Sequence, residues 1–145
     1  MAAEEEINLI LSRMKETLPV RFFKRVDETS AGISAVLRYL YETGGSTVTA
    51  GNISEFMHVS TARVAVLLKK MAAKGLIEKT SDKKDARVTV VLLSDHGREV
   101  VKKMQEDMCA QVGAVIDKVG LERTLEFIEI LSEINTVASP PPVEF

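Results

Sequence analysis

The stretch that decides the fold runs from Val59 to Leu93, with the sequence VSTARVAVLLKKMAAKGLIEKTSDKKDARVTVVLL. Its first half predicts a helix, because Ser60 can cap the free amides of a first turn and apolar residues follow at helical spacing. Gly75 fits the end of this helix, where glycine readily takes a left-handed backbone. The second half predicts two strands joined by a polar turn, the second strand being rich in β-branched residues. The apolar stripe of the helix consists of Val64, Leu67, Leu68 and Met71.

Positive charge is concentrated in this stretch. Between Ser60 and Arg87 the chain has eight Lys or Arg residues and three acidic residues, a local charge of +5, whereas the whole chain carries −2. A basic helix followed by a ribbon with a charged tip is suited to DNA, because localised positive charge binds phosphates. The alternative is a solvated lysine face that binds nothing, as is common for charged helix faces.

The composition is that of an ordinary globular protein, with 46% hydrophobic and 28% charged residues in a chain of 145. This length predicts one domain with its own core. No apolar run approaches the roughly 18 residues of a bilayer span, and the amino terminus, MAAEEEINLIL, is acidic where a signal peptide is basic. We therefore expect a cytoplasmic protein with no membrane partner. The single cysteine, Cys109, excludes an internal disulfide framework.

Helical periodicity recurs on both sides of the opening stretch. Thr49 and Ser94 are the expected caps of the short helix before it and of the long helix after it. Phe22 and Phe23 are expected to anchor the segment between the first two helices. The expected helices are 3–18, 30–42, a short one within 47–57, 95–118 and 121–137. The side chains expected inward from the second and third helices are Ile33, Val36, Leu37, Leu40, Tyr41, Ile53, Phe56 and Met57.

A tight turn at His58 and Val59 joins the third of these helices to the Ser60 helix. Two helices joined in this way are typical of a helix-turn-helix, and the strand pair that follows makes it a winged one. The predicted fold class is therefore mainly α (α+β), with a winged helix-turn-helix lobe over residues 30–93 and a two-stranded wing. Three consecutive prolines from Pro140 predict that 138–145 is a disordered tail.

The amphipathic helices at 3–18 and 95–137 need a surface on which to bury their apolar stripes, because the lobe is compact without them. One solution is a helical dimerisation region shared with a second copy of the chain, within a single domain over 1–137. A two-fold dimer would place two recognition helices about 34–36 Å apart, on successive DNA half-sites. The alternative is a monomer in which these helices fold back on the lobe.

Several ordered pieces of the sequence resemble the MarR family of bacterial transcriptional regulators. Thr49–Met57 is similar to the first helix of the family's helix-turn-helix, and Val59–Met71 is similar to its recognition helix. Lys74–Lys79, with the sequence KGLIEK, resembles the segment that leads into the family's wing, and Asp85–Arg87 resembles the wing tip. Leu93–Gly97, with the sequence LSDHG, resembles the start of the following long helix. The order and spacing of these pieces make the resemblance specific.

The resemblance implies a homodimeric repressor that binds double-stranded DNA at a roughly palindromic operator and is released by a small aromatic or phenolic effector. It implies base contacts at the start of the recognition helix, with Arg63 suited to bridge guanine O6 and N7. It also implies that Arg87 enters the minor groove, oriented by Asp85 through a charge-assisted bond. The alternative for Asp85 is an ordinary turn aspartate, and the helix lysines are either phosphate contacts or solvated charges. The expected DNA-binding residues are Ser60, Thr61, Ala62, Arg63, Ala65, Lys69, Lys70 and Lys74 in the helix and Lys83, Lys84, Asp85 and Arg87 in the wing.

The chain departs from the family pattern at several positions. Lys79 and Ala86 stand where arginine is common, which lowers the charge of the wing. Gly51 and Asn52 are poor helix formers, so we expect the first helix of the motif to be short. His58 replaces the usual glycine of the turn, at a position expected to need positive φ.

Catalytic and metal chemistry find little support in the sequence. Ser94, Asp95 and His96 are the residue types of a hydrolytic triad, but consecutive residues at a helix start point in different directions. His58 and His96 lack partners at metal-ligand spacing, so we expect no metal, no cofactor and no enzyme. Cys109 is expected to be a buried packing residue. The alternative function is a winged-helix module that binds proteins and not DNA, which the reduced wing charge and the net acidity favour.

Overall fold

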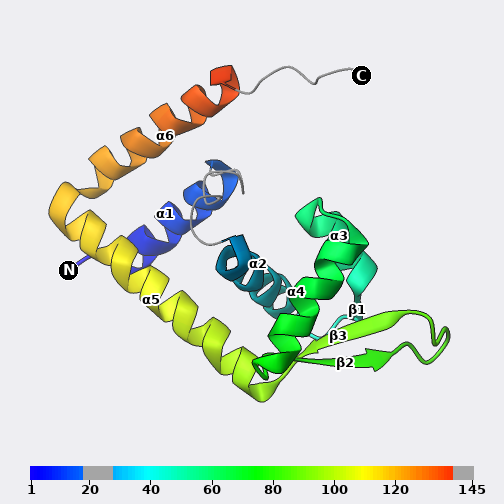
Figure 1. Ribbon diagram of the computed structural model, residues 1–145. Coiled ribbons are helices and arrows are strands. Elements are labelled where there is room, and N and C mark those ends of the chain that lie inside the picture. The colour runs from blue at the N-terminus through cyan, green and yellow to red at the C-terminus, as the bar shows by residue number, and fades with distance from the viewer. Residues whose placement is uncertain (18–27, 139–145) are drawn as a thin grey trace. The chain divides into compact units, whose positions relative to one another are not determined.

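The computed structural model describes residues 1–17 and 28–138 (Figure 1). The segment with Phe22 and Phe23 and, beyond Ala138, the expected tail lie outside the described residues. The expected mixture of helices and a small sheet is confirmed. The elements in chain order are α1 (Glu4–Thr17), α2 (Glu28–Glu42), β1 (Val48–Thr49), α3 (Ala50–Met57), α4 (Thr61–Ala73), β2 (Ile77–Ser81), β3 (Thr89–Leu93), α5 (Asp95–Val119) and α6 (Leu121–Ala138).

The described residues group into two compact units. Residues 28–104 form the winged unit, and residues 1–17 together with 105–138 form the helical unit. The ten first residues of α5 belong to the winged unit and the remainder to the helical unit.

The core of the winged unit lies between the three helices α2, α3 and α4, the small sheet and the start of α5. The expected stripe of α4 is confirmed, since Val64, Leu68 and Met71 are at most 2% exposed and Leu67 packs against the same core. The most buried layer also contains Val36 and Leu37 of α2, Ile53 of α3, Val91 of β3 and Val101 of α5. One side of α4 is thereby fixed against the core, and its other side is exposed and available to bind a partner.

The sheet of the winged unit is antiparallel, with the strand order β1-β3-β2. The two expected wing strands pair from Ile77 opposite Leu93 to Ser81 opposite Thr89. The third strand, β1, pairs Val48 with Val91 and was not expected, because two residues are too few to show a strand period. It ties the chain segment before α3 to the base of the wing.

Two aromatic side chains differ from the expected core. Tyr41 is 40% exposed, so its expected inward position is wrong. Tyr39, at the opposite edge of the α2 stripe, packs on the core instead, and its ring stacks on Phe56 with centroids 4.3 Å apart and planes at 17°. Phe56 itself is 45% exposed, so only one face of its ring is covered. The edge of the stripe that becomes buried is the one that α3 covers.

The end of α4 and the start of α5 meet at one close junction of the winged unit (Figure 1). Gly75, with φ +69°, donates to Ala72 O, and Leu76 donates to Met71 O, which together form a Schellman motif. Ser94 then binds both residues after the helix, with its amide 3.1 Å from Leu76 O and its hydroxyl 2.5 Å from Gly75 O. The expected helix stop and helix cap therefore form a single structure.

Gly97 makes this junction sterically feasible. It is buried in the first turn of α5, and its amide donates to Ser94 Oγ at 2.9 Å. A Cβ atom at this position would overlap the Leu76 carbonyl oxygen and lie 3.0 Å from the carbonyl carbon. Because both atoms belong to backbone, the clash could be relieved only by moving α5 or β2.

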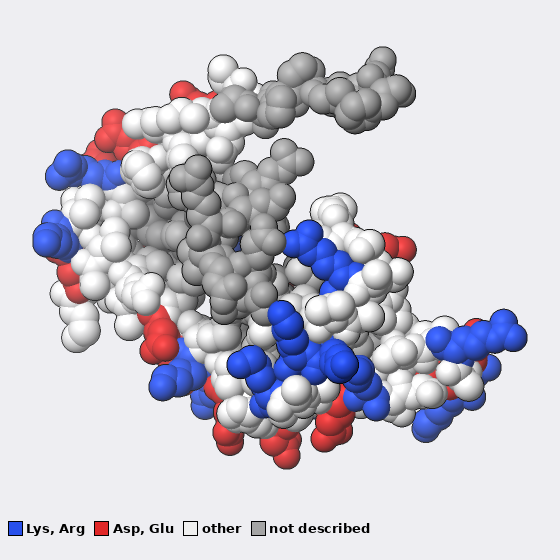
Figure 2. Space-filling view, viewed as in Figure 1, with Lys and Arg blue, Asp and Glu red and all other residues white. Residues whose placement is uncertain are grey.

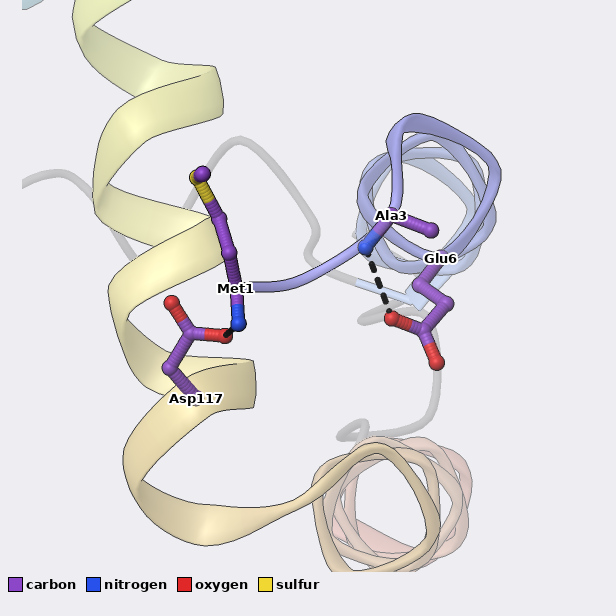
Figure 3. Close-up of polar contacts among 4 residues, drawn as sticks. All are labelled: Met1, Ala3, Glu6 and Asp117. Atoms are coloured by element: carbon purple, nitrogen blue, oxygen red, sulfur yellow. Dashed lines mark hydrogen bonds and ion pairs between the residues drawn. The ribbon is translucent and has the colours of Figure 1, made fainter.

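The helical unit is built around Ile10, Val112, Ile116 and Ile128, from α1, α5 and α6. Figure 3 shows how the amino terminus is tied to this unit: the terminal amine lies 3.5 Å from Asp117 Oδ1, and the Ala3 amide donates to Glu6 at 2.9 Å. At the other end of α1, Asn135 of α6 donates its side-chain amide to Thr17 O at 2.9 Å. The chain before α1 is thus tied to α5 through Asp117, and the end of α1 is tied to α6 through Asn135.

We predict that Gly97→Ala lowers the free energy of unfolding by about 1–3 kcal/mol, because overpacking against backbone forces a backbone shift. Gly51→Ala is the matched control, since Gly51 is exposed in α3 and its added Cβ would meet only the Thr49 hydroxyl at 3.5 Å. The control should leave stability unchanged or raise it by up to about 1 kcal/mol. Urea unfolding followed by circular dichroism at one protein concentration measures both, and equal stabilities of the two variants would contradict the proposed clash.

Candidate nucleic-acid interface

The turn between α3 and α4 is fixed by backbone geometry that the sequence anticipates. His58 has φ +52°, which confirms the expected positive φ at this position. The Val59 amide donates a hydrogen bond to Ser54 O at 3.2 Å, and the Ser54 hydroxyl donates one to Val59 O at 2.6 Å. The angle between the two helices of the motif is therefore held by hydrogen bonds on both sides of the turn.

Both helices of the motif have the expected caps. Thr49 accepts a hydrogen bond from the Asn52 amide at 3.1 Å, and the Asn52 side chain accepts one from the Thr49 amide at 2.9 Å, a capping box. This explains Asn52, a poor helix former, in an eight-residue helix. Ser60 caps α4 by accepting from the Arg63 amide at 3.3 Å. The start of α4 is thus held in place before any ligand arrives.

The outer face of α4 carries every residue expected to bind DNA from this helix, and all of them are exposed. At 3.6 residues per turn, Ala62 and Lys69 lie directly opposite the buried stripe, and Arg63, Lys70 and Lys74 line one edge of the face. Figure 2 shows Lys and Arg side chains gathered over α4 and again at the tip of the wing. The helix itself contains no acidic residue. The helix therefore presents positive charge from a backbone that is fixed by packing on the core.

The tip of the wing is shaped by a residue that was not expected to matter. Asp82 Oδ1 accepts from the amides of Lys84 at 2.7 Å and Asp85 at 3.2 Å, and the Asp82 amide donates to Val88 O at 2.9 Å. An aspartate that binds the backbone two residues on is a common turn former, and that preference is the sequence signal for it. Lys83, Lys84 and Arg87 are exposed at this turn.

The expected role of Asp85 needs correction. Its carboxylate accepts from the backbone amide of Arg87 at 3.0 Å, and within the described chain no ion pair joins it to the Arg87 guanidinium. Asp85 is therefore a turn aspartate, because its short side chain reaches the nearby backbone before it reaches the arginine side chain.

One further residue of the outer face was missed by the sequence analysis. Val66 is 57% exposed and lies in the middle of α4, away from the core. The signal for it was present, since Val66 is an aliphatic residue that does not fit the spacing of the buried stripe.

The residues considered for catalytic, redox or metal chemistry have the following places in the structure. The Ser94 hydroxyl is bound to Gly75 O and to the Gly97 amide, so it serves as a cap. Cys109 is half-buried. No group of three or more His, Cys, Asp or Glu residues in the described chain could hold a metal ion. None of the described helices is long and apolar enough to span a bilayer.

A capped helix pair with a tight turn, a basic second helix and a charged hairpin defines a winged helix-turn-helix protein, a DNA-binding regulator of transcription. Residues 34–88 match the model of the MarR family, which confirms over that segment the resemblance seen in the motifs.

Comparison with known proteins agrees with this class. An uncharacterised HTH-type transcriptional regulator of Bacillus subtilis (strain 168), YdgJ, is 24% identical over 136 residues, which cover 91% of this chain and 79% of that protein. The heme sensor protein PefR from Streptococcus agalactiae has a TM-score of 0.60 at 19% identity, covering 96% of this chain and 97% of PefR. The transcriptional regulator Tm0710 from Thermotoga maritima has a TM-score of 0.57 at 20% identity, covering 92% and 94%. The two structures support the fold.

We predict that Asp82→Ala opens the tip of the wing without unfolding the protein. Loss of two hydrogen bonds worth about 1 kcal/mol each should speed hydrogen exchange at the Lys84 and Asp85 amides roughly tenfold or more. Asp82→Asn keeps an oxygen acceptor at the same place and should exchange nearly as the wild type does. NMR hydrogen exchange measures this, and unchanged exchange in Asp82→Ala would show that another group shapes the tip.

Proposed function

We propose that this protein is a homodimeric repressor that inserts α4 into the major groove of a roughly palindromic operator and places the wing along the flanking minor groove. The observation that carries the proposal is the division of α4 into a buried apolar side and an exposed side with three cations and no acid, followed by a fourth cation, Lys74, at the C-cap. Burial fixes the helix, so its backbone needs no further ordering when the cations meet DNA. The fold shared with a heme sensor supports release by a small ligand, which we place in the aromatic or phenolic class from the family resemblance.

Within the interface we propose two kinds of contact. Ser60, Thr61, Ala62, Arg63 and Ala65 lie at the start of α4, where a recognition helix reaches base edges, and Arg63 has the fork geometry that guanine requires. The contacts to phosphate, which add affinity without reading sequence, come from Lys69, Lys70 and Lys74 of the helix and from Lys83 and Lys84 of the wing, while Arg87 enters the minor groove.

We predict that Arg63→Ala and Lys70→Ala weaken DNA binding in different ways. The probe is a duplex selected by the wild-type protein from a random pool, compared with a scrambled duplex at several salt concentrations. Arg63→Ala should lose most of the preference for the selected duplex, because a bidentate base contact gives about 1–3 kcal/mol of discrimination. Lys70→Ala should weaken binding to both duplexes and reduce the salt slope by about 1.

The same experiment distinguishes a DNA-binding regulator from a winged-helix module that binds only proteins. A module that binds only proteins would show no salt-dependent retention on either duplex. If Arg63→Ala and Lys70→Ala both bind as the wild type does, the DNA-binding residues are assigned wrongly even though the protein binds DNA.

The proposed dimer rests on apolar surface in the helical unit. Exposed side chains follow one face of α6, with Phe127 64%, Ile130 49% and Ile134 54% exposed. An open apolar pocket of about 330 Å³ adjoins this face and is lined by Val115, Val119, Arg123, Thr124 and Phe127. A helix with so much apolar surface is typical of an interface, and a second copy of the chain would cover it with the same face.

We predict that Ile130→Glu converts the dimer into a monomer, because a two-fold interface would bury the new carboxylate without a partner. Leu92→Glu is the control, since Leu92 is 41% exposed on β3 of the winged unit. Light scattering should give half the mass for Ile130→Glu and the wild-type mass for the control, with circular dichroism reporting that both are folded. A wild-type mass for Ile130→Glu would contradict the proposed interface.

A further inference from the structure

The centre of the outer face of α4 is aliphatic. Val66 is 57% exposed, whereas the buried aliphatic residues of the same helix, Val64 and Leu68, are at most 2% exposed. At 3.6 residues per turn Val66 points away from the core, next to Ala62 one turn earlier and Lys70 one turn later. An apolar side chain therefore occupies the place where a partner of this helix would make its central contact.

We propose that Val66 is a specificity residue that packs against the 5-methyl group of a thymine in the major groove, so that each half-site requires an A·T pair at the position facing it. The inference rests on the proposed function, in which α4 enters the major groove. It adds a requirement for thymine at one position to the recognition of guanine by Arg63.

The chemistry of the groove edges favours thymine. All four bases present hydrogen-bonding atoms in the major groove, but only thymine also presents a methyl group there, beside its O4 acceptor. Valine has no donor or acceptor, so a polar base edge placed against it would lose its water without gaining a partner. The same valine gains from covering the methyl group of thymine.

The neighbours of Val66 allow this contact. A valine side chain is short, so it can touch a base only if the helix backbone comes close to the groove floor. Ala62, one turn earlier on the same face, and the exposed Ala65, the preceding residue, both end at Cβ, so they leave room for this approach. The longer side chains of Lys69 and Lys70, which are also exposed, can reach outward to phosphates. The cations around Val66, with no acid in the helix, favour DNA over an apolar protein partner.

The test compares thymine with uracil, which lacks only the 5-methyl group and keeps the same base pairing. A duplex selected by the wild-type protein from a random pool is prepared with single thymine-to-uracil replacements at each thymine of one half-site. The wild type and Val66→Ser are titrated against each duplex by fluorescence anisotropy. Leu92→Ser is the control, because it also removes an exposed aliphatic side chain, 41% exposed, from the winged unit. Circular dichroism reports whether the variants are folded.

We expect one position in the half-site at which uracil weakens wild-type binding about three- to tenfold. Val66→Ser should bind the thymine and uracil duplexes equally at that position, as a double-mutant cycle requires for a direct contact, and Leu92→Ser should discriminate as the wild type does. If the wild type prefers the selected duplex over a scrambled one but tolerates uracil everywhere, the role of Val66 is overturned and the proposed function stands. Discrimination that persists in Val66→Ser also overturns it. If no duplex is preferred over a scrambled one, the proposed function fails and this inference with it.

Discussion

The carbonyl groups of Gly75 and Leu76 are the point on which the winged unit depends. They lie between the end of α4 and the start of β2, and they accept both hydrogen bonds that Ser94 donates at the start of α5. Gly97 lets the first turn of α5 lie against them. The wing is the hairpin that leaves this junction after Leu76 and returns to it at Ser94. Its position relative to α4 is therefore set by the contacts of four residues, Gly75, Leu76, Ser94 and Gly97. A DNA-binding surface made of a helix and a hairpin needs such a fixed relation, since both elements must match one DNA duplex.

The distribution of charge follows from the same architecture. The chain carries a net charge of −2, yet the residues from Ser60 to Arg87 carry +5. The buried stripe of α4 orients its cations outward, and the turn built by Asp82 does the same for the lysines at the wing tip. An acidic remainder discourages unselective binding to nucleic acid, while the local field attracts phosphate. Selectivity is then left to the few side chains that reach base edges.

Much of this fold is visible in the sequence because its signals are local. The Ser60 cap, the Gly75 stop and the positive φ of His58 each depend on the backbone within one turn, and all three are found as expected. The strand β1 and the burial of Tyr39 in place of Tyr41 depend on partners distant in sequence, so spacing alone did not find them. In the candidate site, the exposed cations were predictable from helix periodicity. The turn-forming role of Asp82 and the exposure of Val66 required the structure, because each is defined by where the chain turns in space.

The central claim is that α4 and the wing, and not the apolar face of α6, form the surface that meets DNA. The most direct measurement is a titration of the isotope-labelled full chain with a selected duplex, followed through the backbone amide resonances. The account predicts that the largest changes fall between Ser60 and Lys74 and at the wing tip between Asp82 and Arg87, with little change around Phe127 and Ile130. Changes centred on α6, with α4 and the wing tip unaffected, would contradict it.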